Sequence, residues 1–349
     1  MPRRNTRLRS TAPWAVLIVI VLFIAGAIFF PGINSMPSDG TPATIAVHRG
    51  DGFRRIVEKL HEAKAVRFRW PLLATGALIP QLHKIKPGRY SIPGNLSTLN
   101  LLRYLQSRPQ DEVQLMIPNG VEQKKITGII AASLDIDSTA FMEASRDRKL
   151  LASLSIQEKD TEGYLFPGTY NFPWASTPKE VIAFLAGRFR AFYSESLKQD
   201  TARAGLDETR LLTLASIVEA ETPIDAEKPL IASVYLNRLR KKMRLQADPT
   251  VQYAIAEDNR PLYFKDLAID SPYNTYRHAG LPPGPICNPG PASIRAVLHP
   301  AKTDYLFFVA TGRGGHAFAS TLADHNRNIR RYRIARKELQ TGTNDGNQQ

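Results

Sequence analysis

The longest uncharged apolar stretch of the chain lies near its start and predicts a membrane-spanning helix over residues 14–31. Residues 14–30 contain no charged side chain, and the stretch is just long enough to cross a bilayer of about 30 Å. Arginines at positions 3, 4, 7 and 9 precede it, so the positive-inside rule predicts that residues 1–13 stay in the cytoplasm and that the rest of the chain lies outside it. A cleaved signal peptide is the alternative, because Ala25-Gly26-Ala27 is similar to a cleavage site. Since the apolar stretch is long for a signal peptide and continues past these residues, a retained anchor is predicted.

The pattern beyond this helix predicts a linker over residues 32–43 and a small mixed subdomain over residues 44–110. The linker is rich in Pro, Ser and Gly. Strands are expected at Ala43–His48 and within the turn-containing segment 86–93, together with two helices that each have one apolar face. The positions that define those faces are Phe53, Ile56, Val57 and Leu60, and then Leu99, Leu102 and Leu105 after Ser97. Such a strand–helix–helix–strand unit is either a glycan-binding module or a stalk domain, and the pattern does not separate the two.

Residues 111–336 form a larger body in which helical and strand patterns alternate, which makes the fold class α+β. A well-defined helix start lies at Thr177, where Thr177 is the N-cap, Pro178 occupies the first turn and Glu180 reaches back to the cap. From Tyr263 the chain is rich in loops. The remaining predicted elements are a strand at Val113–Ile117, helices around 126–132, 139–144 and 230–240, a hairpin from 305–310 and 317–320, and a disordered tail at 337–349.

Glu219 is an acid placed where an amphipathic helix should show its apolar side. In the run Leu214–Thr222, the helical face that holds Leu212, Ala215 and Ser216 continues onto Glu219. A carboxylic acid among apolar neighbours resists ionisation, so its pKa rises and it can donate a proton near neutral pH. Glu221 lies about 200° around the helix and is expected to be solvated. A core-edge Glu219 paired with an Arg or Lys is the alternative.

Polar residues downstream of Glu219 are the next candidates. Asp248 lies before Pro249 at an expected helix start, where capping competes with direct chemistry. Asn274 and Tyr276 lie among turn residues, from which amide hydrogen bonds and ring stacking can reach a sugar. Asn274 could instead close its own turn. A zinc site built from His299, His316 and His325 matches no metal-binding spacing, so no metal and no cofactor are expected.

The charge balance adds a partner class. Lys and Arg number 46 against 32 Asp and Glu, which gives a formal net charge of +14, so the surface suits a polyanion such as nucleic acid, anionic lipid or an acidic cell-wall polymer. No nucleic-acid recognition motif is present, so nucleic acid is not the expected partner. Cys287 is the single cysteine, which excludes an internal disulfide and a cysteine-based zinc cluster.

Together these stretches resemble the MltG (YceG-like) family of endolytic murein transglycosylases. The resemblance covers residues 162–326 in order, and a looser match at Gly50–Phe53 and Gly88–Tyr90 resembles the LysM-like subdomain of that family. Gly168 departs from the family, which usually has Asp there. The blocks that carry the resemblance are Leu214–Thr222, Arg244–Val251, Tyr273–Tyr276, Gly280–Gly290, Ala301–Tyr305, Gly314–His316 and His325-Asn326.

The resemblance implies a lytic transglycosylase that cleaves the MurNAc–GlcNAc β-1,4 bond within nascent glycan strands and leaves 1,6-anhydro-MurNAc ends. Glu219 would be the acid and then the base, and the muramic C6 hydroxyl would be the nucleophile, so one carboxylate suffices where a hydrolase normally uses two. The family reading also implies a single-pass anchor in the inner membrane, a periplasmic catalytic domain and penicillin-binding synthases as neighbours. The residues expected to bind substrate are Gln246, Asp248, Thr250, Asn274, Tyr276, His316 and Asn326. An ordinary muramidase and a non-catalytic wall-binding protein are the rivals.

Overall fold

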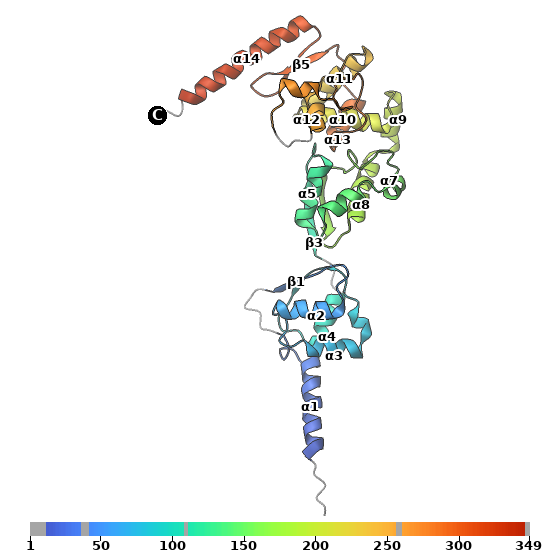
Figure 1. Ribbon diagram of the computed structural model, residues 1–349, viewed down its shortest axis with the longest axis vertical. Helices are drawn as coiled ribbons and strands as arrows, with labels where there is room; N and C mark the ends of the chain where they lie inside the picture. The colour runs from blue at the N-terminus through green and yellow to red at the C-terminus, as the bar shows by residue number, and fades with distance from the viewer. Residues whose placement is uncertain (1–11, 36–41, 108–110, 256–259, 346–349) are drawn as a thin grey trace, which may run out of the picture. The chain divides into compact units, whose positions relative to one another are not determined.

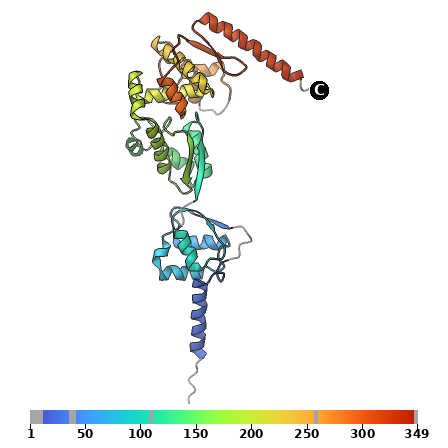
Figure 2. The ribbon, with the colours of Figure 1, turned by 180° about the vertical axis from the view of Figure 1, so that it is seen from behind.

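A computed structural model describes residues 12–35, 42–107, 111–255 and 260–345 and divides the chain into two compact units. The first unit contains residues 1–113, 133–135 and 171–176, and the second contains the remainder. Figures 1 and 2 show the helices and strands of each unit from opposite sides. The predicted boundary at residue 110 lies close to Val113, but two short later segments also join the first unit.

The first unit is a two-stranded antiparallel sheet with helices packed against it. Strands β1 (Ala43–Val47) and β2 (Gly88–Ile92) pair with Ile45 opposite Tyr90, and the inward side chains of both strands enter the core. Between them lie α2 (Phe53–Glu62), α3 (Trp70–Leu78) and the 3₁₀ helix η1 (Pro80–His83), and α4 (Thr98–Ser107) follows β2. Both predicted helical faces pack inward as expected, whereas α3 was not predicted. The mixed α/β character is confirmed, and a LysM-like identity stays a prediction.

The first helix, α1 (Ala12–Phe29), ends against this unit. Ala27 and Ile28 are buried, and the carbonyl of Ala27 accepts a hydrogen bond of 2.8 Å from the Thr98 hydroxyl. Asn34 is also buried and accepts from the backbone N–H of Phe68 at 2.8 Å. Asn34 and Ser35 are therefore packed where a linker was expected, and residues 36–41 lie outside the described residues. Among the described helices, none has the length and apolar content of a bilayer-spanning segment.

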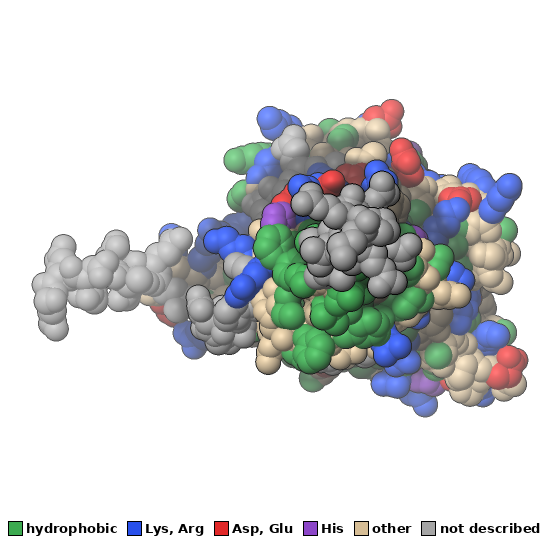
Figure 3. All heavy atoms as spheres, turned by 90° about the horizontal axis from the view of Figure 1, so that it is seen from below, with side chains coloured by type: hydrophobic (Ala, Val, Ile, Leu, Met, Phe, Trp, Pro, Cys, Tyr) green, Lys and Arg blue, Asp and Glu red, His purple; other side chains and the backbone are tan. Residues whose placement is uncertain are grey.

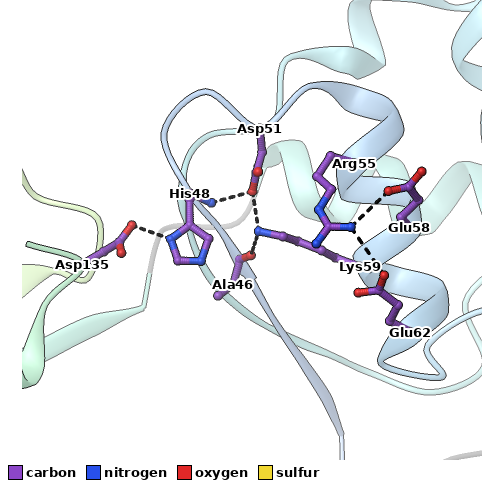
Figure 4. Close-up of polar contacts among 8 residues, drawn as sticks. All are labelled: Ala46, His48, Asp51, Arg55, Glu58, Lys59, Glu62 and Asp135. Atoms are coloured by element: carbon purple, nitrogen blue, oxygen red, sulfur yellow. Dashed lines mark hydrogen bonds and ion pairs between the residues drawn. The ribbon is translucent and has the colours of Figure 1, made fainter.

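A polar corner joins the loop after β1 to the helix α2 (Figure 4). The carboxylate of Asp51 accepts from the backbone N–H of His48 at 2.8 Å and from the Lys59 ammonium at 2.5 Å. Lys59 also donates to the carbonyl of Ala46, and the His48 ring contacts the Asp135 carboxylate at 2.7 Å. These bonds fix the β1–α2 turn and attach the segment around Asp135 to the first unit.

The second unit is mostly helical and is built around α10 (Glu208–Glu221). Every residue from Leu211 to Val218 is buried, because α9, α11, α12 and α13 pack around α10. A helix enclosed on all sides is apolar all round and has no solvated face in its middle. The helices in contact with α10 are α9 (Glu195–Arg203), α11 (Lys228–Arg240), α12 (Asp248–Ile255) and α13 (Pro291–Leu298).

Shorter elements complete this part of the chain. The predicted cap of α8 is confirmed, since Thr177 accepts from the N–H of Glu180 while Glu180 accepts from the N–H of Thr177. Strands β3 and β4 form one two-stranded sheet, and β5 and β6 form the predicted hairpin. Their bounds, with those of the remaining elements, are β3 (Glu112–Ile117), α5 (Gln123–Ser133), α6 (Ser138–Ala144), α7 (Arg148–Ser153), β4 (Gly168–Pro173), α8 (Pro178–Phe192), η2 (Asp225–Glu227), η3 (Phe264–Ala268), β5 (Phe307–Ala310), β6 (His316–Ala319) and α14 (Leu322–Asp345).

Two local features differ from the sequence-based expectation. The tail predicted to be disordered from residue 337 continues α14 as far as Asp345, and Glu338 pairs with Arg313 at 2.9 Å. At Gly168 the backbone has φ +151°, and a Cβ there would lie 2.7 Å from the Tyr170 hydroxyl. A side chain at this position, including the Asp usual in the family, would therefore need Tyr170 to move.

Candidate active site

Glu219 lies near the end of α10 with both carboxylate oxygens engaged. One oxygen accepts from the Lys228 ammonium at 3.0 Å. The other accepts from the backbone N–H of Gly290 at 2.9 Å and from the Ser293 hydroxyl at 2.7 Å. The side chains of Glu219 and Lys228 are only 5% and 2% exposed. Glu219 therefore holds α10 to the first turn of α11 and to the N-terminus of α13, where a negative charge is favoured.

These contacts differ from the apolar surroundings that the helical pattern predicted for Glu219. Its neighbours are a buried cation and two hydrogen-bond donors, and the expected apolar surroundings are not found. Although burial alone lowers the pKa of Lys228, its hydrogen bonds with Asp225 and Glu219 raise it, so the ammonium stays charged. These are the surroundings of the alternative considered from the sequence, a core-edge carboxylate paired with a Lys. A catalytic role for Glu219 stays a prediction.

Glu221, two residues on, has the environment that was expected for Glu219. It is partly buried, and one of its oxygens accepts a hydrogen bond from the Tyr235 hydroxyl on α11. The pKa of Glu221 is raised from 4.5 to about 7. Burial is the largest cause and the negative charge of Asp248 also raises the pKa, whereas the hydrogen bond from Tyr235 lowers it. The expectation that Glu221 is solvated is wrong, because α11 covers the side of α10 on which it lies. Glu221 is therefore a proton donor poised near neutral pH.

Glu221 lines two neighbouring cavities, and Asp248 lines both with it. The first cavity has a volume of about 350 Å³ and the second about 480 Å³. The side chains around the first are Glu221, Tyr235, Arg238, Leu245, Gln246, Asp248, Tyr276, Phe307, Phe308, Leu322 and His325. Those around the second are Gly120, Glu122, Ala220, Glu221, Asp248, Pro249, Gln252, Tyr253, Leu262, Ile286 and Cys287. Glu219 lines neither cavity and lies behind Gly120, whose Cβ position is 3.3 Å from the Glu219 Cγ.

A larger cavity of about 800 Å³ lies on the other side of α11. It is lined by Ser233, Asn237 and Arg240, whereas the first cavity beside Glu221 is lined by Tyr235 and Arg238 of the same helix. Its carboxylate, Asp304, is exposed and accepts from the Ser320 hydroxyl at 2.6 Å. It contains no buried acid, so the chemistry is assigned to the cavities at Glu221.

Three of the predicted substrate-binding residues line the first cavity at Glu221. They are Gln246, Asp248 and Tyr276. The Tyr276 hydroxyl donates to Asp248 at 2.5 Å, which orients the carboxylate at the start of α12. Gln246 is exposed and has a positive φ of 49°. This backbone conformation is uncommon for a residue with a side chain and is typical of turns and functional sites.

The other four predicted residues do not line these cavities. Thr250 is buried and donates to the carbonyl of Ala247. Asn274 is fully buried and closes its own loop by donating to the carbonyls of Leu267 and Ile269 at 3.0 and 2.9 Å. The His316 ring contacts Glu227 at 2.7 Å and packs edge-on against Phe308, behind the cavity wall. Asn326 is exposed on α14. The role of these four residues as substrate contacts stays a prediction, and Thr250 and Asn274 also form hydrogen bonds within their own loops.

The sequence analysis assigned no site role to Tyr235 or Arg238 and considered His325 only as a zinc ligand, yet all three line the first cavity. Arg238 is buried, donates to the carbonyls of Leu306 and Leu245 at 2.7 and 2.6 Å, and lies over the Phe307 ring. His325 stacks on the same Phe307 ring, with the two ring centroids 5.1 Å apart. Burial and the charge of Arg238 lower the pKa of His325, so its ring is neutral. A cation near the end of a helix is usually solvated, so no local pattern indicated that Arg238 would be buried.

The histidines considered for a zinc site each have a different neighbour. His299 lies 3.5 Å from Asp200, His316 contacts Glu227, and His325 stacks on Phe307. Within the described part of the chain, no group of three or more His, Cys, Asp or Glu residues could hold a metal ion.

Comparison with known proteins identifies the family. Residues 45–331 match the YceG-like family. The chain belongs to the YceG-like family. It is 37% identical to an endolytic murein transglycosylase of Bacillus subtilis over 239 residues, and this alignment covers 64% of the chain. It is 28% identical to an endolytic murein transglycosylase of Streptococcus pneumoniae over 355 residues, and this alignment covers 90% of the chain. The chain spans 66% and 63% of the lengths of these curated relatives, just under two thirds.

A solved structure supports the same fold. A crystal structure of a YceG-like protein from Listeria monocytogenes aligns with a TM-score of 0.57 at 29% identity, over 81% of this chain and 97% of that one. The mixed α+β fold of this YceG-like protein is thus shared by a solved relative.

Proposed function

We propose that this YceG-like protein is an endolytic murein lytic transglycosylase and that Glu221 is its catalytic acid. The proposal is supported by its membership of the family and by the names of its bacterial relatives. The observation that carries the assignment of Glu221 is its position in both cavities together with a pKa of about 7. The substrate is the MurNAc–GlcNAc β-1,4 bond within a nascent glycan strand.

The proposed reaction uses the carboxyl of Glu221 twice. Tyr235 donates to one oxygen of Glu221, so the other oxygen is the one that presents its proton to the cavity. That proton passes to the bridging oxygen as the C1–O bond of MurNAc breaks and GlcNAc leaves with a free 4-hydroxyl. The resulting carboxylate accepts the proton of the muramic C6 hydroxyl, whose oxygen bonds to C1 and closes the 1,6-anhydro ring. The group ends protonated, ready for the next cycle.

The substrate contacts proposed within the cavities come from the predicted residues that reach them. Gln246 and Asp248 offer an amide and a carboxylate to sugar hydroxyls, and Tyr276 offers a ring edge beside them. The basic charge of the chain, +14 overall, would attract the carboxylates of murein peptide stems. Arg238 shapes the cavity wall through its two backbone carbonyl contacts and is assigned no contact with substrate.

A hydrolytic muramidase is the second candidate, and one observation favours it. Asp248 lines the same two cavities as Glu221, so a second carboxylate lies beside the proposed acid. A paired carboxylate can activate water, which is the arrangement of hydrolases. The hydrogen bond from Tyr276 and the position of Asp248 at the start of α12 provide an alternative, structural role for this acid.

Mass spectrometry of the products separates these two reactions. Purified full-length protein is incubated with uncrosslinked glycan strands, and the muropeptides are analysed after digestion. The lytic reaction leaves 1,6-anhydro ends, whereas hydrolysis leaves reducing ends one water heavier. Anhydro ends in the parent support the proposal, and reducing ends alone would establish a muramidase.

We also propose that the chain is held at the inner membrane with its N-terminus in the cytoplasm and its catalytic unit in the periplasm. Support comes from the arginines at positions 3, 4, 7 and 9 and from the exposed apolar side chains of α1 between Trp14 and Ile24. At that location the protein would meet nascent strands beside penicillin-binding synthases. Extraction of membranes at alkaline pH tests the attachment, since a peripheral protein would be released.

A further inference from the structure

Helix α3 has an apolar face that is exposed to solvent. Trp70, Leu73 and Ala77 lie on one helical stripe, since they are spaced by three and four residues, and all are exposed. The stripe widens at Leu78, which is 75% exposed. Phe68, just before the helix, is 50% exposed. The opposite side of α3 packs into the core of the first unit through Leu72, Thr75 and Gly76, so the apolar exposed face is not needed for that core.

This face continues onto α1. The rings of Phe23 on α1 and Trp70 on α3 lie with their centroids 6.2 Å apart, and the two helices pack against each other. From Val16 to Ile24 each large apolar side chain of α1 is exposed. Figure 3, which views the molecule from the α1 end, shows hydrophobic side chains gathered there in one patch. An apolar surface of this extent marks a binding interface with a protein or a membrane.

The charge of the residues around α3 indicates whether the partner is a protein or a membrane. No Asp or Glu occurs from residue 63 to residue 110, whereas this segment contains eight Lys and Arg residues. Two of them, Arg67 and Arg69, are exposed and alternate with Phe68 and Trp70 at the start of α3. Aromatic side chains mixed with arginine are typical of the interfacial layer of a bilayer, and clustered basic residues bind anionic headgroups.

We propose that an α3 surface, made of Arg67, Phe68, Arg69, Trp70, Leu73, Leu78 and Ile79, lies in the interfacial layer of a bilayer that contains anionic lipid. The first unit is then held against the membrane at two places, α1 and α3, so α1 is not a lone flexible tether. The inference rests on the membrane attachment proposed above and is independent of the cleavage chemistry.

Tryptophan fluorescence tests the proposal, because the chain contains only Trp14, Trp70 and Trp174. Full-length variants that keep one tryptophan each, with the other two replaced by Phe, are reconstituted into vesicles of phosphatidylcholine with phosphatidylglycerol that contain brominated lipid. Trp70 is expected to be quenched by at least about half. Trp174, which is 7% exposed, serves as the reference that lipid should not reach.

The three single-tryptophan proteins distinguish the failures. Quenching of Trp14 without Trp70 would overturn the α3 surface and leave the anchor standing. Quenching of none would overturn both. An emission of Trp70 that shifts with protein concentration in the absence of lipid would show a second copy on this face and also overturn the proposal. Circular dichroism establishes that each variant is folded.

Charge and apolar variants provide matched controls. The double variant Arg67→Gln, Arg69→Gln should reduce the quenching of Trp70 in anionic vesicles severalfold at about 0.15 M salt. The control is the double variant Arg54→Gln, Arg103→Gln, which removes two other exposed arginines of the same unit and should leave the quenching unchanged. Leu78→Gln should also reduce it, whereas Ile334→Gln, at a 58% exposed position of α14, should not. Equal effects in both pairs would contradict a specific α3 surface.

Discussion

Two glutamates that lie two residues apart in one helix have different surroundings because different elements pack around them. Glu219 accepts hydrogen bonds from the Lys228 ammonium and from the backbone N–H of Gly290 at the N-terminus of α13. Glu221 faces Tyr235 and a cavity, and its burial favours the neutral form. The side chains are chemically identical, so the assignment of acid and structural carboxylate follows from the environment alone.

The pH dependence of cleavage should report Glu221. Because the acid must be protonated in the free enzyme, kcat/KM is expected to be constant below about pH 6 and to fall tenfold per unit above a midpoint near 7. Asp248→Asn removes a negative charge that raises the pKa of Glu221, so the midpoint of that variant should move to lower pH. A profile that stays level to pH 9 in both proteins would contradict the assignment.

Removal of the Glu219 charge should cost stability. Glu219→Gln leaves the Lys228 ammonium, which is 2% exposed, with only Asp225 as a counter-ion and weakens the contact with α13. The free energy of unfolding is expected to fall by roughly 3 kcal/mol, the cost of breaking a buried ion pair. Denaturant titration at pH 6 measures it, with Glu195→Gln as the control because its side chain is 75% exposed. A loss no larger than that of the control would remove the structural role.

At the scale of elements, Asn274 organises the loop that presents Tyr276. Its amide donates to two carbonyls, and its oxygen accepts from the N–H of Tyr276 at 3.0 Å. Asn274→Ala leaves these buried backbone groups without a partner and should lower the free energy of unfolding by about 2 kcal/mol. Because Tyr276 loses its support, KM should also rise.

Asp270→Ala is the control for Asn274→Ala. Asp270 belongs to the same loop, but its side chain is 85% exposed. Calorimetry and initial-rate measurements on both variants test the expectation. If Asn274→Ala behaved like Asp270→Ala in both, Asn274 would not hold the loop.

Elements governed by neighbouring residues could be predicted from the sequence. The cap at Thr177, Pro178 and Glu180 depends on a four-residue pattern and is present as expected. The hairpin at residues 305–320 follows from two short apolar runs around a glycine-rich turn. In both cases the hydrogen-bond partners lie within 13 residues of each other, so the local pattern contains the necessary information.

Features decided by distant segments could not be predicted. Helix α3 has apolar residues on all sides, so no periodicity marked it. Glu221 was placed on a solvated face because the amphipathic pattern assumes one buried side, whereas α10 is covered by four other helices. The role of Arg238 depends on carbonyls of Leu245 and Leu306, and the second of these is 68 residues away.

At the scale of the whole molecule, two buried acids make stability depend on pH. Burial raises the pKa of Glu162 to about 8 and that of Glu221 to about 7. Since both folded values exceed the unfolded value, the stability from these groups is complete below about pH 4.5 and is lost as the pH rises through 7 and 8. For Glu221 the loss approaches about 3 kcal/mol at high pH.

Thermal unfolding between pH 5 and 9 checks this dependence. The parent should lose stability steadily over that range, whereas Glu221→Gln, which cannot ionise, should lose less and become more stable than the parent at pH 9. If the two proteins showed parallel curves, Glu221 would not titrate with a raised pKa.

Side-by-side activity of Glu221→Gln and Glu219→Gln tests the central claim most directly. Both variants are assayed on nascent glycan strands at pH 6, anhydro-MurNAc ends are counted by mass spectrometry, and rates are expressed per folded molecule. Glu221→Gln is predicted to lower the rate at least about 100-fold while remaining folded, the loss expected for a missing general acid, and Glu219→Gln to stay within about threefold of the parent. Cleavage that persists in Glu221→Gln and disappears in folded Glu219→Gln would contradict the account.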